Sequence, residues 1–236
     1  MNVSRRINRI LELMEPGEML ADIGCDHGYM CIRAVEQGLF SGAVAADIKK
    51  GPLERAETNI LKAGMTDRIR TVLSDGFRSV DPGFDCAVIC GMGGLLIRRI
   101  LTEEPDVWKN CSQMILGPQS EIEELRSWLL SGSGFGIFRE DLVCDGGKTY
   151  VLIDARPKDQ CAPEALKRSM TPLSIRYGEP SLQKDPESYR LHLQELSVKY
   201  RMAREKAEAG NSGRSLARVS SLSAEIDSIR RLMEQE

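Results

Sequence analysis

Short apolar segments alternate with helical patterns along the first two-thirds of the chain, and this alternation restricts the possible folds more than any other feature. The apolar segments have the length of buried strands, and they occupy residues 19–23, 43–47, 69–73, 85–90 and 113–116. Helical patterns lie near residues 29–37, 52–63, 95–103 and 120–130. Strands that alternate with helices are typical of a parallel sheet covered on both faces.

Two further strands are predicted at residues 137–144 and 150–155, and the turn between them contains Asp145-Gly146-Gly147. Such a sequence is typical of a tight hairpin. An amphipathic helix over residues 4–14 precedes the first strand. The sequence therefore predicts a Rossmann-like α/β domain over residues 1–155, with a mostly parallel seven-stranded sheet that ends in an antiparallel hairpin.

The remaining residues, 156–236, begin with a connector containing several prolines and continue with two strongly periodic stretches. Apolar residues recur there at alternating intervals of three and four, which is the pattern of a coiled coil. They are Tyr189, Leu193, Leu196, Tyr200, Ala203 and Ala207, then Val219, Leu222, Ile226, Ile229 and Met233. Because Gly210-Asn211-Ser212-Gly213 separates the stretches, we expect an antiparallel helical hairpin. Periodicity alone leaves open whether this hairpin binds a ligand or serves only for packing or dimerisation.

Composition excludes some classes of protein. No segment approaches the roughly 18 consecutive apolar residues of a membrane-spanning helix, and charges interrupt the apolar residues of the N-terminus. The seven cysteines form no CxxC motif, which favours reduced thiols and a cytoplasmic location. The net charge of −3 combines an acidic first part with a mildly basic tail, which suggests a polyanionic partner for the tail.

The first predicted strand ends in Asp22-Ile23-Gly24-Cys25-Asp26-His27-Gly28, after which a helix begins. Gly24 and Gly28 allow the backbone to approach a ligand, and the amides of the following helix can hold an anionic group. Asp22 and Asp26 are placed to meet a cationic group. Carboxylates would repel a pyrophosphate, so this loop disfavours an NAD enzyme.

Acidic residues also follow the next two strands. Asp47 ends the second strand, beside Ile48, where such architectures use a carboxylate to hold ribose hydroxyls. Asp75-Gly76 follows the third strand, and Asp75 could accept a hydrogen bond from an adenine amino group. Together these residues predict a site for a nucleoside with a cationic group, namely S-adenosylmethionine. The predicted cofactor-binding residues are Asp22, Gly24, Asp26, Gly28, Asp47, Ile48, Asp75, Gly76 and Gly91.

The fourth strand runs into Cys90-Gly91-Met92-Gly93-Gly94. Ligands collect at the carboxyl ends of parallel strands, so the substrate is expected here. The Asn/Asp-Pro-Pro-aromatic motif of many amine methyltransferases is missing. Three glycines would leave a flat surface that admits a base, although tight strand–helix packing is an alternative explanation for them.

Six segments, in this order, resemble the bacterial tRNA adenine-22 N1-methyltransferase family: DIGCDHGYM, AADIKKGPLERAETNILKAG, SDG, CGMGG, LGPQSEIEELRSWL and DGGKTYVLI. The resemblance covers residues 1–155, and the helical hairpin matches that family's tail in kind. Met30-Cys31 stand where family members often have Leu-Pro. The resemblance implies a class I methyltransferase that uses S-adenosylmethionine, releases S-adenosylhomocysteine, needs no metal and methylates N1 of adenine 22 in tRNA.

For this reaction, Asp26 is expected to orient the cofactor or balance charge, and His27 to position the substrate. The residues predicted to line the reacting region are Asp26, His27, Met92 and Gly93. Basic residues predicted to bind RNA are Arg5, Arg9, Lys49, Arg98, Lys199 and Arg204. We expect a monomer or weak dimer. The alternatives are a methyltransferase of another RNA or a small molecule, with the coiled coil used for dimerisation, and a non-catalytic nucleotide-binding protein.

Overall fold

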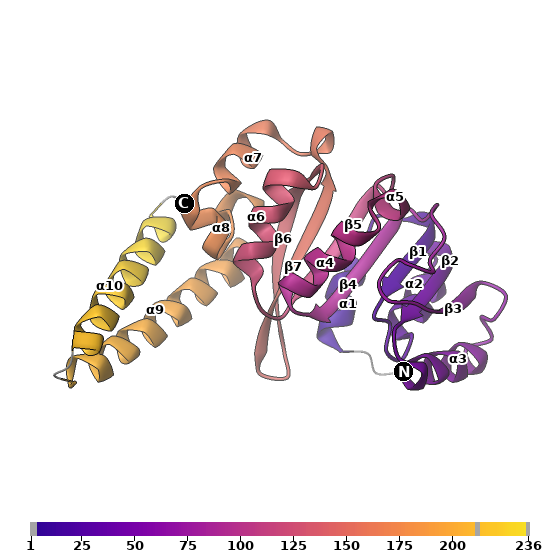
Figure 1. Ribbon diagram of the computed structural model, residues 1–236, viewed down its shortest axis with the longest axis horizontal. Coiled ribbons are helices and arrows are strands. Elements are labelled where there is room, and N and C mark those ends of the chain that lie inside the picture. Colours follow the sequence, from indigo (N-terminus) through magenta and orange to yellow (C-terminus); the bar gives the residue numbers. More distant parts are fainter. Residues whose placement is uncertain (1–3, 211–212, 235–236) are drawn as a thin grey trace.

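The computed structural model describes residues 4–210 and 213–234, and a single seven-stranded sheet forms its centre (Figure 1). The strands are β1 (Gly17–Ile23), β2 (Phe40–Asp47), β3 (Ile69–Leu73), β4 (Cys86–Met92), β5 (Gln113–Pro118), β6 (Phe135–Asp145) and β7 (Lys148–Pro157). Their order is β3-β2-β1-β4-β5-β7-β6. Strands β1 to β5 pair in parallel, and β7 runs antiparallel to both β5 and β6. The predicted sheet is confirmed.

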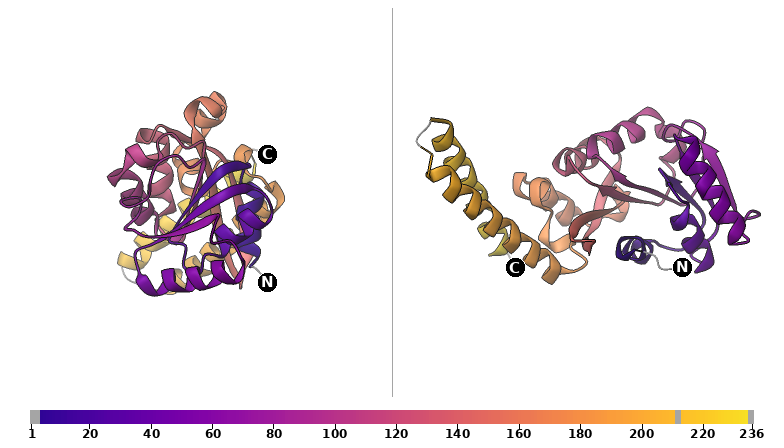
Figure 2. Two further views of the ribbon diagram at one scale, coloured as in Figure 1. Left: turned by 90° about the vertical axis from the view of Figure 1, so that its right-hand side faces the viewer. Right: turned by 90° about the horizontal axis from the view of Figure 1, so that it is seen from below.

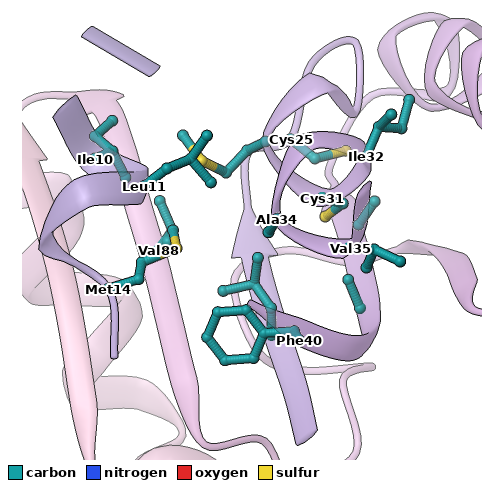
Figure 3. Close-up of a cluster of buried hydrophobic side chains, with 14 of the residues drawn as sticks. Ile10, Leu11, Met14, Cys25, Cys31, Ile32, Ala34, Val35, Phe40 and Val88 are labelled. Atoms are coloured by element: carbon teal, nitrogen blue, oxygen red, sulfur yellow. The ribbon is translucent and has the colours of Figure 1, made fainter. Parts of the chain in front are cut away.

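Helices cover both faces of this sheet. One face carries α1 (Arg5–Leu13), α2 (Tyr29–Glu36) and α3 (Lys50–Lys62). The other carries α4 (Gly94–Glu103), the short α5 (Pro105–Trp108) and α6 (Ile122–Gly132). Adjacent strand residues point to opposite faces, so Leu20 and Val88 join the first core while Ala21 and Ile89 join the second. In Figure 3, Ile10, Leu11 and Met14 of the N-terminal segment lie against Val88 of the sheet.

The ends of the elements lie within a few residues of the predicted ranges, and several strands begin earlier than predicted, as β2 does at Phe40 rather than at residue 43. Helix α6 begins at Ile122 rather than near 120, because Glu121 has a left-handed backbone conformation (φ 47°). The four-residue α5 lacks the length to produce a helical pattern and was not predicted. The hairpin turn is confirmed: Gly146 and Gly147 both have positive φ, as a two-residue turn of this kind requires.

The connector folds into short helices, namely η1 (Lys158–Gln160), α7 (Pro163–Ser169), α8 (Pro172–Tyr177) and η2 (Pro180–Leu182). The long helices α9 (Pro186–Glu208) and α10 (Gly213–Met233) then lie side by side and extend away from the sheet (Figures 1 and 2). At their base, Tyr189 and Leu193 of α9 pack with Ile229 and Leu232 of α10. Leu232 is buried more deeply than the predicted Met233. Asn211 and Ser212 of the predicted turn lie outside the described residues.

A buried ion pair between α6 and β6, with the hydrogen bonds around it, joins the connector that precedes the helical pair to the sheet. The Nε of Arg126, in α6, donates to Oε1 of Glu140, in β6, at 2.7 Å, and both side chains are almost fully buried. Arg126 Nη1 also donates to the carbonyl oxygen of Arg176 at 3.0 Å, and Gln183 Nε2 donates to Glu140 Oε2 at 3.1 Å. These contacts fix α8 and the start of the tail against the edge of the sheet.

All seven cysteines are free thiols, and five of them are buried. Among the described residues, no helix combines the length and the apolar character needed to cross a membrane.

Candidate functional site

A cavity of about 370 Å³ lies at the carboxyl ends of β1, β2, β3 and β4. The strand order reverses between β1 and β4, and open α/β sheets bind ligands at such a point. A smaller cavity of about 130 Å³ adjoins it and shares Gly24, Asp26 and Cys90 with it. Of the predicted site residues, the larger cavity is lined by Gly24, Asp26, Asp47, Ile48, Asp75, Gly76, Gly91 and Met92, and the smaller one also by Asp22 and His27.

The loop after β1 is held against the end of β2. The amides of Gly24 and Cys25 both donate to the carbonyl oxygen of Ala46, at 2.8 and 3.0 Å. Gly24 has φ +81°, and an added Cβ would stand 2.3 Å from Cε of Met92 inside the cavity. Gly28 lines neither cavity. Its absent side chain instead allows close approach to Ala56 of α3, where an added Cβ would lie 3.1 Å from the Ala56 Cβ.

Asp22 is a buried carboxylate with little compensation from neighbouring groups. Its side chain receives one weak contact, from the Cys31 thiol at 3.9 Å. Burial, and then the nearby Asp47 carboxylate, raise the pKa of Asp22 to about 7. A buried carboxylate is costly unless a cation accompanies it. The site therefore fits a ligand with a positive charge next to Asp22.

Asp47 organises the rim of the larger cavity. Its Oδ1 accepts a hydrogen bond from the amide of Lys49 at 2.9 Å, and its Oδ2 accepts one from the amide of Asp26 at 3.3 Å. Each carboxylate oxygen can accept a second hydrogen bond. Asp47 could therefore hold two neighbouring hydroxyl groups of a ligand.

Asp75 is less available than its sequence position indicates. Its carboxylate pairs with Nη2 of Arg99 at 2.9 Å and with Nη1 of Arg78 at 3.6 Å. Arg99 lines the same cavity and was not among the predicted residues. Arg99 lies three residues after Leu96 and directly before Ile100, and both of these residues also line the cavity. Residues at this spacing share one face of a helix, so the pattern of α4 could have identified Arg99 as a site residue.

Asp26 and His27 both line the smaller cavity. Asp26, which has φ +49°, pairs with Arg55 at 3.3 Å and lies 3.4 Å from Nε2 of His27. The His27 ring stacks on Tyr29 with 5.6 Å between centroids. Neither Arg55 nor Tyr29 was predicted as a site residue. The half-exposed His27 ring can contact a ligand, and its backbone is braced by Asn59.

The glycines after β4 have different roles. Gly91 has φ +81° and is open, since an added Cβ would meet only Gln119, at 3.9 Å. Gly94 packs tightly, because its Cβ would stand 2.2 Å from the carbonyl oxygen of Glu121. Gly93 lines neither cavity and faces the Ser120 and Glu121 side chains. The alternative explanation, tight strand–helix packing, therefore applies to Gly94. Because Met92 also lines the larger cavity, glycines alone do not form the flat surface that was expected there.

The predicted RNA-binding residues are dispersed. Arg5, Lys49, Arg98 and Lys199 are exposed, and Lys49 lies at the rim of the larger cavity. Arg9 is bound to Asp141 and Glu12 and thereby joins α1 to β6. Arg204 pairs with Glu208 at 3.3 Å. Both guanidinium groups thus already have acidic partners.

Comparisons with known proteins agree with this geometry. Residues 3–153 match a family described as a methyltransferase domain. The tRNA (adenine(22)-N(1))-methyltransferase of Bacillus subtilis is 31% identical over 163 residues, which cover 69% of this chain and 68% of that protein. A putative tRNA methyltransferase of Mycoplasma pneumoniae is 35% identical over 158 residues, covering 64% of this chain and 70% of the relative.

A solved structure is similar over almost the whole chain. It is a putative tRNA (m1A22) methyltransferase of Streptococcus pneumoniae in complex with S-adenosyl-L-methionine, with a TM-score of 0.81 and 25% identity. The match covers 98% of this chain and 99% of the other, so it includes the helical tail. This chain therefore belongs to the bacterial tRNA (adenine-22 N1)-methyltransferase family.

Proposed function

We infer that this protein transfers a methyl group from S-adenosylmethionine to N1 of adenine 22 in tRNA. Family membership supports the reaction and the substrate. The observation that carries the inference is the convergence of Asp22, Asp47 and the Gly24 turn on adjoining cavities at one edge of the sheet. A small molecule as acceptor would leave the extended helical tail without a use in the reaction.

The cavity residues are assigned roles from their contacts. We assign the ribose hydroxyls to Asp47, which lines the larger cavity. We assign the positively charged end of the cofactor to Asp22, and Gly24 leaves room for close approach. When bound, S-adenosylmethionine supplies an electrophilic methyl group. Because Arg99 engages Asp75, the adenine amino group is not assigned to that carboxylate.

The protein has to position the acceptor rather than deprotonate it. N1 of adenine carries a lone pair, so no side chain must remove a proton before it reacts. Holding two reactants in line can contribute roughly 7–11 kcal/mol. The Asp26 carboxylate can stabilise the positive charge that develops on the base, and we assign His27, with Tyr29, to positioning. Since N1 normally lies within base pairs, the adenine must be turned out of the RNA.

The reaction is tested with unmodified tRNA transcripts and methyl-labelled S-adenosylmethionine. We expect N1-methyladenosine in the nuclease digest of the wild-type transcript, and none when adenine 22 is replaced by guanine. Mass spectrometry of the nucleosides distinguishes the products. Equal methylation of both transcripts would contradict the assigned position, and label in small metabolites alone would favour the small-molecule alternative.

The pH dependence of cofactor binding tests the role of Asp22. The raised pKa of Asp22 means that the ligand-free fold binds this proton more tightly than the unfolded chain does. Ionisation of Asp22 therefore lowers the stability of the ligand-free fold progressively as pH rises from about 4 towards 7. A cationic ligand beside the ionised carboxylate offsets this loss of stability. We expect affinity for S-adenosylmethionine to rise by about tenfold from pH 6 to pH 8. Calorimetry should show this rise in the wild type and lose it in Asp22→Asn, whereas a flat wild-type profile would count against the assignment.

We propose that the chain divides into a catalytic domain, residues 1–155, and a tRNA-binding tail, residues 156–236, and that it acts as a monomer or weak dimer in the cytoplasm. The triple variant Lys199→Glu/Arg201→Glu/Lys206→Glu reverses exposed charges on α9. Since each lost phosphate contact weakens binding and reduces its salt dependence, we expect at least about tenfold weaker tRNA binding. Cofactor affinity should not change.

A matched control is the triple variant Arg68→Glu/Arg70→Glu/Lys109→Glu. It makes the same three charge reversals outside the tail, near the starts of β3 and β5. Filter binding at several salt concentrations compares the two triple variants. Equal losses of tRNA affinity would show that only net charge matters, and the tail would then have no specific role.

A further inference from the structure

A third cavity, of about 460 Å³, lies between α4, α6 and α8 and shares no lining residue with the larger cavity described above, to which we assign the cofactor and which we call the cofactor cavity. Its walls include Arg98 of α4, Glu123, Glu124 and Trp128 of α6, and Pro172 and Ile175 of α8. The amide of Gly94, the first residue of α4, donates to the carbonyl oxygen of Ser120, two residues before α6 begins, at 2.8 Å. Because Glu123 and Glu124 stand in the first turn of α6, which follows β5, their end of the cavity lies toward the sheet edge at which the cofactor cavity lies.

One wall of this cavity is apolar and preformed. Trp128 is half-buried, and its indole ring packs against the second core together with Ile175. Pro172 adds a rigid ring beside them. Aromatic side chains in such a position stack on nucleobases, and this stacking contributes substantially to the binding of unpaired RNA.

The polar wall carries charges without partners. Within residues 4–210 and 213–234, no side chain pairs with Glu123 or Glu124, or with the guanidinium of Arg98. An ionised carboxylate only accepts hydrogen bonds, whereas arginine only donates them. The cavity thus presents two carboxylates and one cation beside an aromatic face, and the hydroxyl groups of Ser127 and Ser131 also line it.

The two carboxylates favour the base that offers the most suitable hydrogen-bond donors. Guanine carries two adjacent donors, N1–H and the 2-amino group, on its Watson–Crick edge, which match a carboxylate. Adenine and cytosine place an acceptor next to their donor, and uracil has a single donor between two acceptors. A nucleotide phosphate would complement Arg98. We propose that this cavity binds an unpaired guanine nucleotide of the tRNA substrate, a proposal that rests on the proposed function.

The location agrees with a nucleotide near the reacting adenine. Arg98 stands four residues after the start of α4, which is about 6 Å along the helix axis. The next residue, Arg99, lines the cofactor cavity. A guanine held by Glu123 or Glu124 and Trp128 would therefore anchor the tRNA while the adenine occupies the reacting region.

The first test uses the full-length double variant Glu123→Gln/Glu124→Gln with saturating S-adenosylmethionine. We expect the KM for tRNA to rise about tenfold, while kcat stays within about twofold and cofactor affinity is unchanged. The control is Glu18→Gln/Asp67→Asn, which neutralises two exposed carboxylates that lie outside the tail and outside the three cavities described above. An unchanged KM in the cavity variant overturns the proposal.

The second test measures base selectivity directly through tryptophan fluorescence. Trp128 faces the cavity, whereas the other tryptophan, Trp108, is buried. With S-adenosylhomocysteine saturating the cofactor site, GMP should quench the fluorescence at several-fold lower concentration than AMP, CMP or UMP. The double variant should lose this preference. Equal quenching by the four nucleotides overturns the proposal. If wild-type protein forms no N1-methyladenosine in tRNA, the proposed function itself fails, which is a distinct result.

Discussion

Asp47→Ala is expected to weaken S-adenosylmethionine binding by at least about 100-fold while the protein remains folded. The assigned contacts are two hydrogen bonds to a carboxylate, each worth roughly 1.5–3 kcal/mol. The substitution also removes the acceptor for the amides of Lys49 and Asp26, so the two loops that border the cavity lose their connection. Isothermal titration calorimetry measures the change.

Two variants serve as controls for this prediction. Asp47→Asn keeps the shape and one acceptor oxygen, so its loss of affinity should be about tenfold. Asp67→Ala removes an exposed carboxylate at the opposite edge of the sheet and should have no effect. If Asp47→Ala bound the cofactor as tightly as the wild type, the ribose would have to lie elsewhere.

Arg126→Ala is expected to lower the free energy of unfolding by about 3–5 kcal/mol, because it leaves the Glu140 carboxylate buried without its partner. Both side chains of this pair are almost fully buried. The variant also leaves the carbonyl oxygens of Ile175 and Arg176 without their donor. Urea unfolding monitored by circular dichroism measures the loss.

Arg70→Ala is the matched control for this stability prediction. Arg70 pairs with Asp81 at 2.8 Å, but both side chains are exposed, and exposed pairs contribute only about 0–1 kcal/mol. Adding Glu140→Leu to Arg126→Met should recover part of the lost stability, since no buried charge then remains unpaired. Equal effects of Arg126→Ala and Arg70→Ala would show that the junction is not a buried ionic contact.

Local patterns were sufficient to predict the sheet. The alternation of short apolar segments with helical patterns predicted the strand positions, and Gly146 and Gly147 at the turn predicted the antiparallel end. Most predicted cofactor residues meet at one edge, because the ends of parallel strands converge there. These cofactor-binding residues could therefore be predicted from the order of strands and helices alone, without knowledge of side-chain contacts.

The missed features depend on contacts between residues distant in the sequence. Arg99 engages Asp75 across 24 positions, and Arg126 finds Glu140 and the backbone of α8 only after the chain has folded. Gly94 looked equivalent to Gly91, yet the backbone of Glu121 is its close neighbour. The cavity around Trp128 arises from three helices whose relative placement no local pattern specifies.

The central claim is that the cavity at the ends of β1 to β4 holds the cofactor. A crystal structure of the protein with S-adenosylhomocysteine tests it most directly. We expect the ribose hydroxyls within hydrogen-bond distance of the Asp47 carboxylate, and the amino acid end of the ligand beside the Gly24 turn and Asp22. A ligand bound elsewhere, or a cavity left empty at saturating concentration, would contradict the account.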